Sequence, residues 1–266
     1  MPIQEKCRIL EHQQIAPHYF QLTLASAHVS ANAKPGQFVQ VRCSEKYDPL
    51  LHRPLSIHRI SKKEKSFALL YEVVGKGTEL LSQAKVGAEL DVLGPLGNGF
   101  SIDKKTKTAI LVGGGMGVAP LISLVDTLKS ENVKTIYALI GGKTKNSLLC
   151  VKDFKKLTAQ VLLATDDGSC GKKGFVSEGL LSTLENQLSV VSRQSLVIYA
   201  CGPRAMLKAV AKISAKNKLN CQVLMEARMA CGIGTCLGCV IKTKAGYKKV
   251  CDDGPVFDSK EIIWQS

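Results

Sequence analysis

Four cysteines near the end of the sequence have the spacing of metal ligands. Cys231, Cys236 and Cys239 form a C-x4-C-x2-C pattern, and Cys251 follows after eleven intervening residues. This is the plant-type [2Fe–2S] spacing, in which four thiolates converge on two iron atoms. Three glycines stand among these cysteines, namely Gly232, Gly234 and Gly238. We expect them to permit tight turns and to direct N–H groups at sulfur.

Zinc and disulfides are the alternatives for the same cysteines. Zinc sites with four cysteines usually use two C-x2-C pairs, and here only Cys236 and Cys239 form one. The N-terminal sequence MPIQEKCRIL has no basic segment followed by an apolar run, so we expect no signal peptide and a cytoplasmic protein. Cysteines that are not exported stay reduced or bind metals. The spacing therefore favours [2Fe–2S], with zinc as the main alternative.

A glycine-rich loop in the middle of the chain has the composition of a dinucleotide site. Gly113, Gly114, Gly115 and Gly117 lie between a predicted strand and a helix that starts near Ala119. There the backbone can approach a pyrophosphate at the positive end of a helix. The loop departs from the standard fingerprint, since its third glycine position is Val118 and the next strand ends in Gly141-Gly142-Lys143. Such turns also occur without a ligand.

Two further loops support a nucleotide site. Thr165-Asp166-Asp167-Gly168-Ser169 and Cys201-Gly202-Pro203-Arg204 each follow a predicted strand. In open parallel sheets, ligands bind at the carboxyl ends of the strands. Cys201 is either a reactive thiol or, more simply, a buried one at a strand end.

A third candidate site lies in the N-terminal part of the chain. Arg53-Pro54-Leu55-Ser56 places a guanidinium near a hydroxyl, and a guanidinium can bind a phosphate through two hydrogen bonds. Gly75-Lys76-Gly77-Thr78 opens a short helix and offers a second anion nest, with Thr78 as the expected cap. The alternative is a surface arginine and an ordinary capped helix.

The elements that position these residues fall into three segments. Residues 1–102 are predicted to form a small antiparallel barrel, with strands at 19–24, 38–41 and 66–74, turns at 34–36 and 94–99, and a helix at 78–83. Residues 103–220 are predicted to form an α/β domain with a parallel sheet, with strands at 108–112, 135–140, 160–164 and 196–200 and helices at 119–129 and 204–217. Residues 221–266 hold too little apolar material for a core of their own.

The net charge of +14 raises the question whether the protein binds nucleic acid. The lysines occur in scattered clusters with few aromatic residues among them, so we expect solvated surface, an acidic partner face or anionic cofactors rather than a nucleic-acid site. The apolar stretch at 109–125 is short and broken by glycines, so we expect no membrane span.

The RPxS motif, the following Gly-Thr turn, the GGGxGxAP loop and the later CGP together resemble the ferredoxin–NADP reductase superfamily. The resemblance implies FAD on the barrel and a nicotinamide nucleotide on the second domain, with Arg53 on the FAD diphosphate and Ser56 near flavin N5. The positions that match the FAD motifs are Arg53, Pro54, Leu55, Ser56, Leu70, Tyr71, Glu72, Gly77 and Thr78. Those that match the nucleotide motifs are Gly113, Gly114, Gly115, Gly117, Cys201, Gly202 and Pro203.

The whole chain, above all residues 226–240 and 250–257, resembles the electron-transfer subunits of class 1B, NAD-dependent dihydroorotate dehydrogenases. The resemblance implies an FMN-containing catalytic subunit as partner, in a heterotetramer of two subunits of each kind in pyrimidine (UMP) biosynthesis. Electrons would pass from FMN through [2Fe–2S] and FAD to NAD+, and no acid–base residue is expected in this chain. The preference for NAD over NADP rests on the resemblance alone.

Two alternative functions stay open. A subunit of the same architecture could serve a hydrogenase, a sulfite or sulfide reductase, or a transhydrogenase. A zinc-stabilised module that binds a nucleotide without turnover would belong to a different class.

Overall fold

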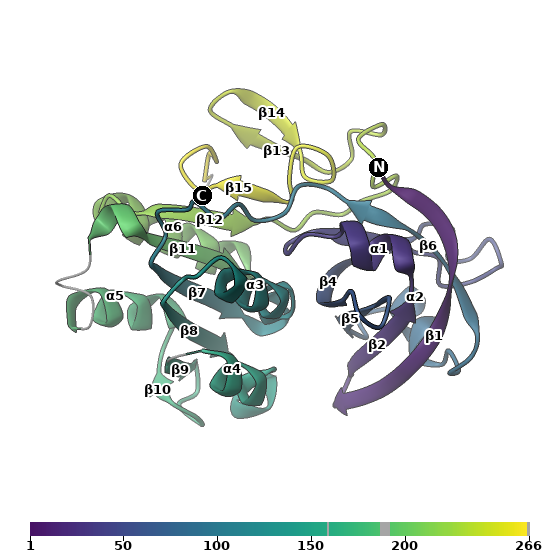
Figure 1. The fold of residues 1–266 in the computed structure, drawn as a ribbon, viewed down its shortest axis with the longest axis horizontal. Helices are drawn as coiled ribbons and strands as arrows, with labels where there is room; N and C mark the ends of the chain where they lie inside the picture. The colour runs from purple at the N-terminus through teal and green to yellow at the C-terminus, as the bar shows by residue number, and fades with distance from the viewer. Residues whose placement is uncertain (159, 187–191, 265–266) are drawn as a thin grey trace. The chain divides into compact units, whose positions relative to one another are not determined.

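Six antiparallel strands close into a barrel in the N-terminal part of the chain, in the order β1-β2-β5-β4-β3-β6. The computed structural model describes residues 1–158, 160–186 and 192–264 (Figure 1). The barrel strands are β1 (Ile3–Ala16), β2 (Tyr19–Ala25), β3 (Phe38–Val41), β4 (Arg53–Ser61), β5 (Ser66–Glu72) and β6 (Glu89–Leu96), with the short helices α1 (Ala27–Asn32) and α2 (Lys76–Ser82) between them. The predicted antiparallel barrel is confirmed.

Every second side chain along the strands points inward, and these side chains fill the barrel interior. In β3, Val39 and Val41 are fully buried in the core, together with Ile57 of β4 and Tyr71 of β5. Because successive side chains of a strand point to opposite faces, Gln40 of β3 projects from the outer face of the barrel. Gln40 is nevertheless only 1% exposed, so other residues cover it.

Several local predictions for this part of the chain were wrong. Helix α2 begins after Gly75, and Thr78 is its third residue rather than its cap. Residues 94–96 were predicted as a turn, but they form the end of β6. Helix α1 was not predicted; the Ser26 hydroxyl caps it by accepting the Val29 amide at 2.8 Å.

The second part of the chain is built on a seven-stranded sheet in the order β10-β9-β8-β7-β11-β12-β15. Its strands are β7 (Thr108–Gly114), β8 (Thr135–Gly142), β9 (Gln160–Thr165), β10 (Lys172–Lys173), β11 (Leu196–Cys201), β12 (Asn220–Leu224) and β15 (Val256–Asp258). The main helices are α3 (Ala119–Ser130), α4 (Val151–Leu157), α5 (Val176–Asn186) and α6 (Arg204–Lys216). The predicted parallel sheet is confirmed, with one addition: β15 pairs antiparallel with β12.

The strand order reverses between β7 and β11. From β7 the chain adds β8 and then β9 on one side, whereas β11 and β12 lie on the other. Such a switch point opens a crevice at the carboxyl ends of the two strands, where ligands bind in sheets of this kind.

The C-terminal residues are shared between two compact units. One unit consists of residues 1–99, 226–241 and 247–255, and the other of residues 100–225, 242–246 and 256–266. Strands β13 (Val240–Thr243) and β14 (Gly246–Lys249) form a two-stranded sheet. The cysteine-rich loop therefore belongs to the same compact unit as the barrel.

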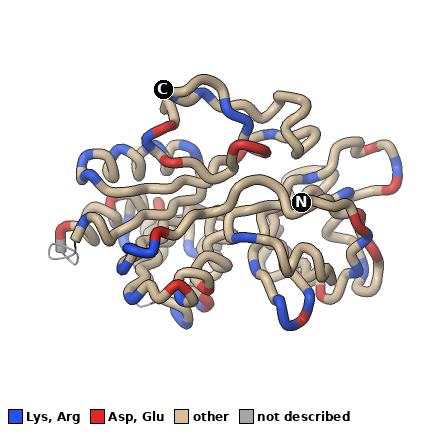
Figure 2. Tube along the Cα trace, turned by 45° about the horizontal axis from the view of Figure 1, so that its top comes forward, with Lys and Arg blue, Asp and Glu red and all other residues tan. Residues whose placement is uncertain are grey.

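Charged residues are distributed along the whole chain (Figure 2). Lysine and arginine occur along the whole trace and alternate with acidic and uncharged stretches (Figure 2). Within the part of the chain that the structure describes, none of the helices has the length and apolar character needed to cross a membrane.

Candidate cofactor sites

The two predicted phosphate-binding segments of the barrel lie side by side. Arg53 begins β4, and its guanidinium packs directly on Gly77 in the first turn of α2. A Cβ atom added to Gly77 would lie 2.7 Å from Cζ and 2.8 Å from Nη2 of Arg53. Arg53 also donates a hydrogen bond to the Leu51 carbonyl. The arrangement fits the diphosphate of a nucleotide cofactor, because a guanidinium can bind it through paired hydrogen bonds.

Thr78 shapes the turn beside Arg53. Its hydroxyl accepts the amides of Val74 at 3.0 Å and Gly75 at 3.3 Å. The side chain is only 7% exposed, so it stabilises the turn instead of presenting the hydroxyl to a ligand. The amides of Gly77 and Thr78 belong to the first helical turn, where N–H groups have no partner within the helix.

The remaining barrel positions divide between the two faces of their strands. Leu55 packs against the core, so its neighbours Pro54 and Ser56 in β4 point to the other face. Tyr71 also belongs to the core, whereas Leu70 and Glu72 point outward. A cofactor on the outer face could therefore meet only the main chain of Tyr71.

A hydrogen-bonded pair that the sequence did not reveal holds the Tyr71 side chain. His12 Nδ1 lies 2.8 Å from the Ala84 carbonyl and donates to it, so Nε2 accepts the Tyr71 hydroxyl at 2.9 Å. Phe20 stacks on Tyr71 with ring centroids 5.8 Å apart. Burial raises the pKa of Tyr71. A single histidine and a single phenylalanine carry no spacing signal, which is why sequence reasoning missed them.

The glycine loop and the CGP segment meet at the switch point of the sheet. Cys201 at the end of β11 pairs with Gly113 at the end of β7. A Cβ atom on Gly117 would lie 2.5 Å from the Gly202 amide nitrogen, and one on Gly114 would lie 2.9 Å from Cδ of Pro203. Gly117 is required because it packs directly on the Cys201–Gly202 backbone, whereas Gly114 leaves room for the side chains of Pro203 and Met206.

Gly115 differs from its neighbours, since it has open space around its Cα and a φ of +54°. It is the position in this loop where the backbone is free to approach a ligand. Cys201 is only 1% exposed, which agrees with a buried thiol at a strand end.

The third predicted loop follows β9. Asp167 Oδ1 accepts the Ser169 amide at 2.9 Å and the Ser169 hydroxyl at 2.7 Å, and these bonds lower the pKa of Asp167. The Ser169 hydroxyl in turn accepts the Lys145 amide at 2.7 Å, which links this loop to the one that follows β8. The three predicted loops follow β7, β9 and β11, which are parallel strands of one sheet. They therefore lie at the carboxyl end of the sheet, as expected for a nucleotide site.

Backbone amides point at the sulfurs of the four predicted ligand cysteines. The Gly234 amide lies 3.1 Å from Cys251 Sγ, and the Gly238 amide lies 3.4 Å from Cys236 Sγ. The Cys251 amide lies 3.4 Å from Cys239 Sγ. Such N–H···S bonds stabilise the negative charge that iron-bound thiolates carry. The prediction that glycine amides face sulfur is confirmed for Gly234 and Gly238.

The four thiols meet as two pairs. The Cys231 thiol hydrogen-bonds with that of Cys236, and the Cys251 thiol with that of Cys239. Burial raises the pKa of Cys231, but hydrogen bonds from Thr235 and nearby amides outweigh it and lower that pKa to about 5. Burial and the adjacent Cys239 raise the pKa of Cys251 to about 12.

The pairing of the thiols can be compared with the ligand set of an iron–sulfur cluster. Two pairs of thiols match a [2Fe–2S] cluster, whose four cysteine ligands are divided between two irons. The donor set therefore fits the cluster.

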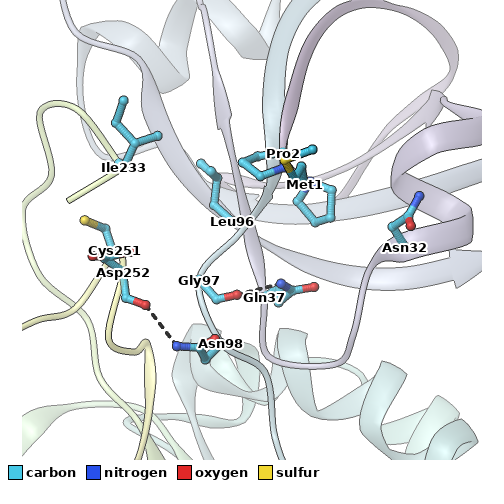
Figure 3. Close-up of a pocket in the computed structure, with 12 residues that line it drawn as sticks. Met1, Pro2, Asn32, Gln37, Leu96, Gly97, Asn98, Ile233, Cys251 and Asp252 are labelled. Atoms are coloured by element: carbon cyan, nitrogen blue, oxygen red, sulfur yellow. Dashed lines mark hydrogen bonds between the residues drawn. The ribbon is translucent and has the colours of Figure 1, made fainter. Parts of the chain in front are cut away.

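The cysteine loop is seated on the end of β6 of the barrel. The Asn98 side-chain amide donates to the Asp252 carbonyl at 2.9 Å, and the Asn98 backbone amide donates to the Gly254 carbonyl at 2.5 Å. A cavity of about 380 Å³ lies here, with Asn98, Gly97 and Cys251 in its lining (Figure 3). The contribution of Asn98 was not anticipated, since it depends on residues far away in the sequence.

Comparison with known families first defines the class of protein. A family model described as the oxidoreductase NAD-binding domain matches residues 111–212. The chain is similar to a solved NADH-dependent reduced ferredoxin-NADP oxidoreductase studied for flavin-based electron bifurcation, with a TM-score of 0.85 and 32% identity over 97% of this chain and 90% of that one. A ferredoxin NADP+ reductase from Neisseria gonorrhoeae with bound FAD and NADP shares the fold at a TM-score of 0.68 and 15% identity, over 80% of this chain and 91% of that one. The chain is an NAD-binding oxidoreductase with the ferredoxin–NADP reductase fold.

The family follows from the C-terminal region and from full-length relatives. The iron-sulfur cluster binding domain of dihydroorotate dehydrogenase B matches residues 226–263. Proteins named dihydroorotate dehydrogenase B (NAD(+)), electron transfer subunit, are 39% identical in Desulforamulus reducens, over 97% of each chain, and 42% identical in Lysinibacillus sphaericus, over 96% of each chain. The chain belongs to the family of dihydroorotate dehydrogenase B electron transfer subunits. The resemblance seen in the motifs is confirmed.

Proposed function

We propose that this chain takes electrons from a dihydroorotate-oxidising catalytic subunit and passes them through a [2Fe–2S] cluster and FAD to NAD+. The observation that carries the proposal is the placement of the cysteine loop and the Arg53–Gly77 arrangement in one compact unit. Family membership supports the same relay, since relatives along the full chain are named electron transfer subunits.

The residues have distinct roles in this proposal. Cys231 and Cys236 bind one iron, and Cys239 and Cys251 bind the other, with amides of the loop donating to their sulfurs. Arg53 binds the FAD diphosphate, and the main-chain amides at the start of α2 complete its contacts. When bound, FAD supplies the exchange between single electrons and hydride.

The sheet residues bind and orient the nicotinamide nucleotide. Gly115 allows the backbone to approach the nucleotide diphosphate, and the carboxylate of Asp167 is held by Ser169 at the same edge. The names of the full-length relatives, which specify NAD(+), support NAD over NADP. The chain needs no acid–base residue for dihydroorotate, because that reaction takes place on the partner.

The partner in this proposal is an FMN-containing catalytic subunit, in a heterotetramer with two subunits of each kind, located in the cytoplasm. The relatives' names imply a catalytic partner, and the cysteine loop supplies the acceptor for its electrons. The abundant lysines do not require a nucleic-acid partner, because they are dispersed along the trace (Figure 2).

Coexpression with the dihydroorotate dehydrogenase catalytic chain of the same organism tests the function. The two chains together should form orotate and NADH from dihydroorotate and NAD+, and omission of this chain should abolish NADH formation. The control is direct oxidation of dihydroorotate by an artificial acceptor, which the catalytic chain should perform alone. A pair that copurifies but forms no NADH would contradict the proposal.

A transhydrogenase subunit is the second candidate, because the electron-bifurcating oxidoreductase shares 32% identity over 97% of this chain. Affinity purification of this chain from its native cells separates the two. A copurified flavoprotein that exchanges hydride between NADH and NADP+, with no dihydroorotate oxidation, would favour the second candidate.

A further inference from the structure

Gln40 is buried without a hydrogen-bond partner beside the cysteine loop. Its side chain is 1% exposed, and neither Nε2 nor Oε1 has a partner among the described residues. Buried amides are almost always hydrogen-bonded, so an unpartnered one indicates a missing ligand atom. An aliphatic side chain would fill the same space without leaving buried polar atoms unpaired. A purely structural role therefore does not explain a glutamine at this position.

The position of Gln40 identifies what the amide faces. Gly232, the residue after Cys231, packs directly on it: a Cβ atom on Gly232 would lie 2.6 Å from Nε2 and 2.7 Å from Cγ of Gln40. Gly232 also has a φ of +73°, so two independent requirements select glycine there. The loop that carries the first cluster ligand is therefore folded over the Gln40 carboxamide.

The strand register also places Gln40 next to the Arg53–Ser56 segment. In the barrel, Gln40 pairs with Pro54 on β4 and with Leu93 on β6. Its neighbours Val39 and Val41 point into the core, so Gln40 points out of the barrel toward the cysteine loop. Gln40 thus lies on the strand that pairs with the proposed FAD segment, and it contacts the proposed cluster segment.

We infer that Gln40 is a positioning residue of the iron–sulfur site, whose Nε2–H donates a hydrogen bond to a sulfur of the bound cluster or of its Cys231 ligand. Sulfide and thiolate accept hydrogen bonds only, so the donor end of the carboxamide must face them. This inference rests on the proposed function. Hydrogen bonds to sulfur stabilise the more negative, reduced cluster and raise its reduction potential.

Labelling tests the contact directly in the unmodified chain. Full-length protein is synthesised in a cell-free system with 15N at the side-chain amide of glutamine, then loaded anaerobically with iron, sulfide and FAD. Pulsed EPR of the reduced cluster should show a 15N coupling, and Gln40→Leu should abolish it. Gln13→Leu, at an exposed position of β1, is the matched control and should leave the coupling intact.

A redox titration followed by EPR measures the consequence. At a fixed potential, Gln40→Leu should lower the ratio of reduced to oxidised cluster by about tenfold, which is 59 mV for a one-electron couple. Gln40→Glu should lower it as well, because a carboxylate cannot donate and adds negative charge. Gln13→Leu should leave the midpoint potential unchanged.

The outcomes separate this inference from the proposed function. Absence of a 15N coupling in the wild-type cluster would overturn the role of Gln40, and so would a coupling to the flavin signal alone. An unchanged midpoint potential in Gln40→Leu would overturn it too. If Gln40→Leu binds no cluster, the presence or absence of the 15N coupling in the wild-type cluster still tests the hydrogen bond. A wild-type chain with no [2Fe–2S] signal at all would instead contradict the proposed function.

Discussion

Gly77→Ala should weaken FAD binding without unfolding the barrel. The new Cβ atom would lie 2.7 Å from Cζ and 2.8 Å from Nη2 of Arg53, closer than a methyl group can approach. Because the guanidinium is the end of a flexible side chain, it should move away while β4 and α2 stay in place. Gly77 does not have a positive φ, so alanine adds no backbone strain.

The size of the effect follows from the interaction that is lost. A hydrogen bond to a charged group contributes about 1.5–3 kcal/mol. Displacing Arg53 from the FAD diphosphate should therefore raise the Kd for FAD by about 10- to 100-fold. The free energy of unfolding of the apoprotein should change by less than about 1 kcal/mol, because alanine is the better helix former and offsets the cost of moving Arg53.

Titration of apoprotein with FAD, followed by quenching of flavin fluorescence, measures the Kd, and urea denaturation measures the stability. Gly75→Ala is the matched control, since its Cα faces open space and its φ of 172° is extended. It should bind FAD with the wild-type Kd. Wild-type affinity in Gly77→Ala would refute the role of Arg53, and an unfolded Gly77→Ala apoprotein would refute the assumption that the guanidinium moves.

Three other perturbations test separate parts of the structure. Gly117→Ala should lower the free energy of unfolding, measured in urea, by about 2 kcal/mol, because its Cβ atom would meet the Gly202 backbone at 2.5 Å. Gly115→Ala, which has open space but a φ of +54°, should lower it by about 1 kcal/mol. Equal losses of stability in the two variants would contradict this packing. Cys236→Ser should abolish NAD+ reduction coupled to dihydroorotate but spare NADH oxidation by artificial acceptors at FAD; coupled activity without a cluster would rule out the relay. Burial, together with the charge of Glu5, raises the pKa of Cys7 from 9.0 to about 12, so the folded state retains the thiol proton that the unfolded state loses. The free energy of unfolding should therefore fall as pH rises from 9 toward 12, by at most about 1.4 kcal/mol per pH unit for this thiol. Cys7→Ala should reduce that slope, and an unchanged slope would show that the Cys7 thiol does not contribute.

Local patterns in the sequence located the cysteine loop and the loops that follow the sheet strands. The cysteine spacing and the glycine loop encode their geometry within a few residues, because thiolates and a phosphate-binding turn need close neighbours in the chain. The strands β7, β8, β9 and β11 were predicted for a similar reason, since each is a continuous apolar run. Strand β1 was missed because most of its residues are exposed and its alternation is weak.

Contacts between distant segments could not be predicted in this way. The approach of Gly232 to Gln40 requires the barrel register and the path of the cysteine loop together. Asn98 lies in the predicted turn at 94–99, but its hydrogen bonds to the Asp252 and Gly254 carbonyls depend on the fold. Spacing thus predicts candidate ligands, whereas the residues that pack around them emerge only from the tertiary structure.

The antiparallel pairing of β15 with β12 has a consequence for solubility. In the sheet, β12 would otherwise be an edge strand with a row of unpaired backbone N–H and C=O groups, and such edges are templates for aggregation. Residues Val256–Asp258 cover part of that edge and are themselves short, which limits how far another chain could extend the sheet. The segment that follows Cys251 therefore also protects the seven-stranded sheet against intermolecular strand pairing.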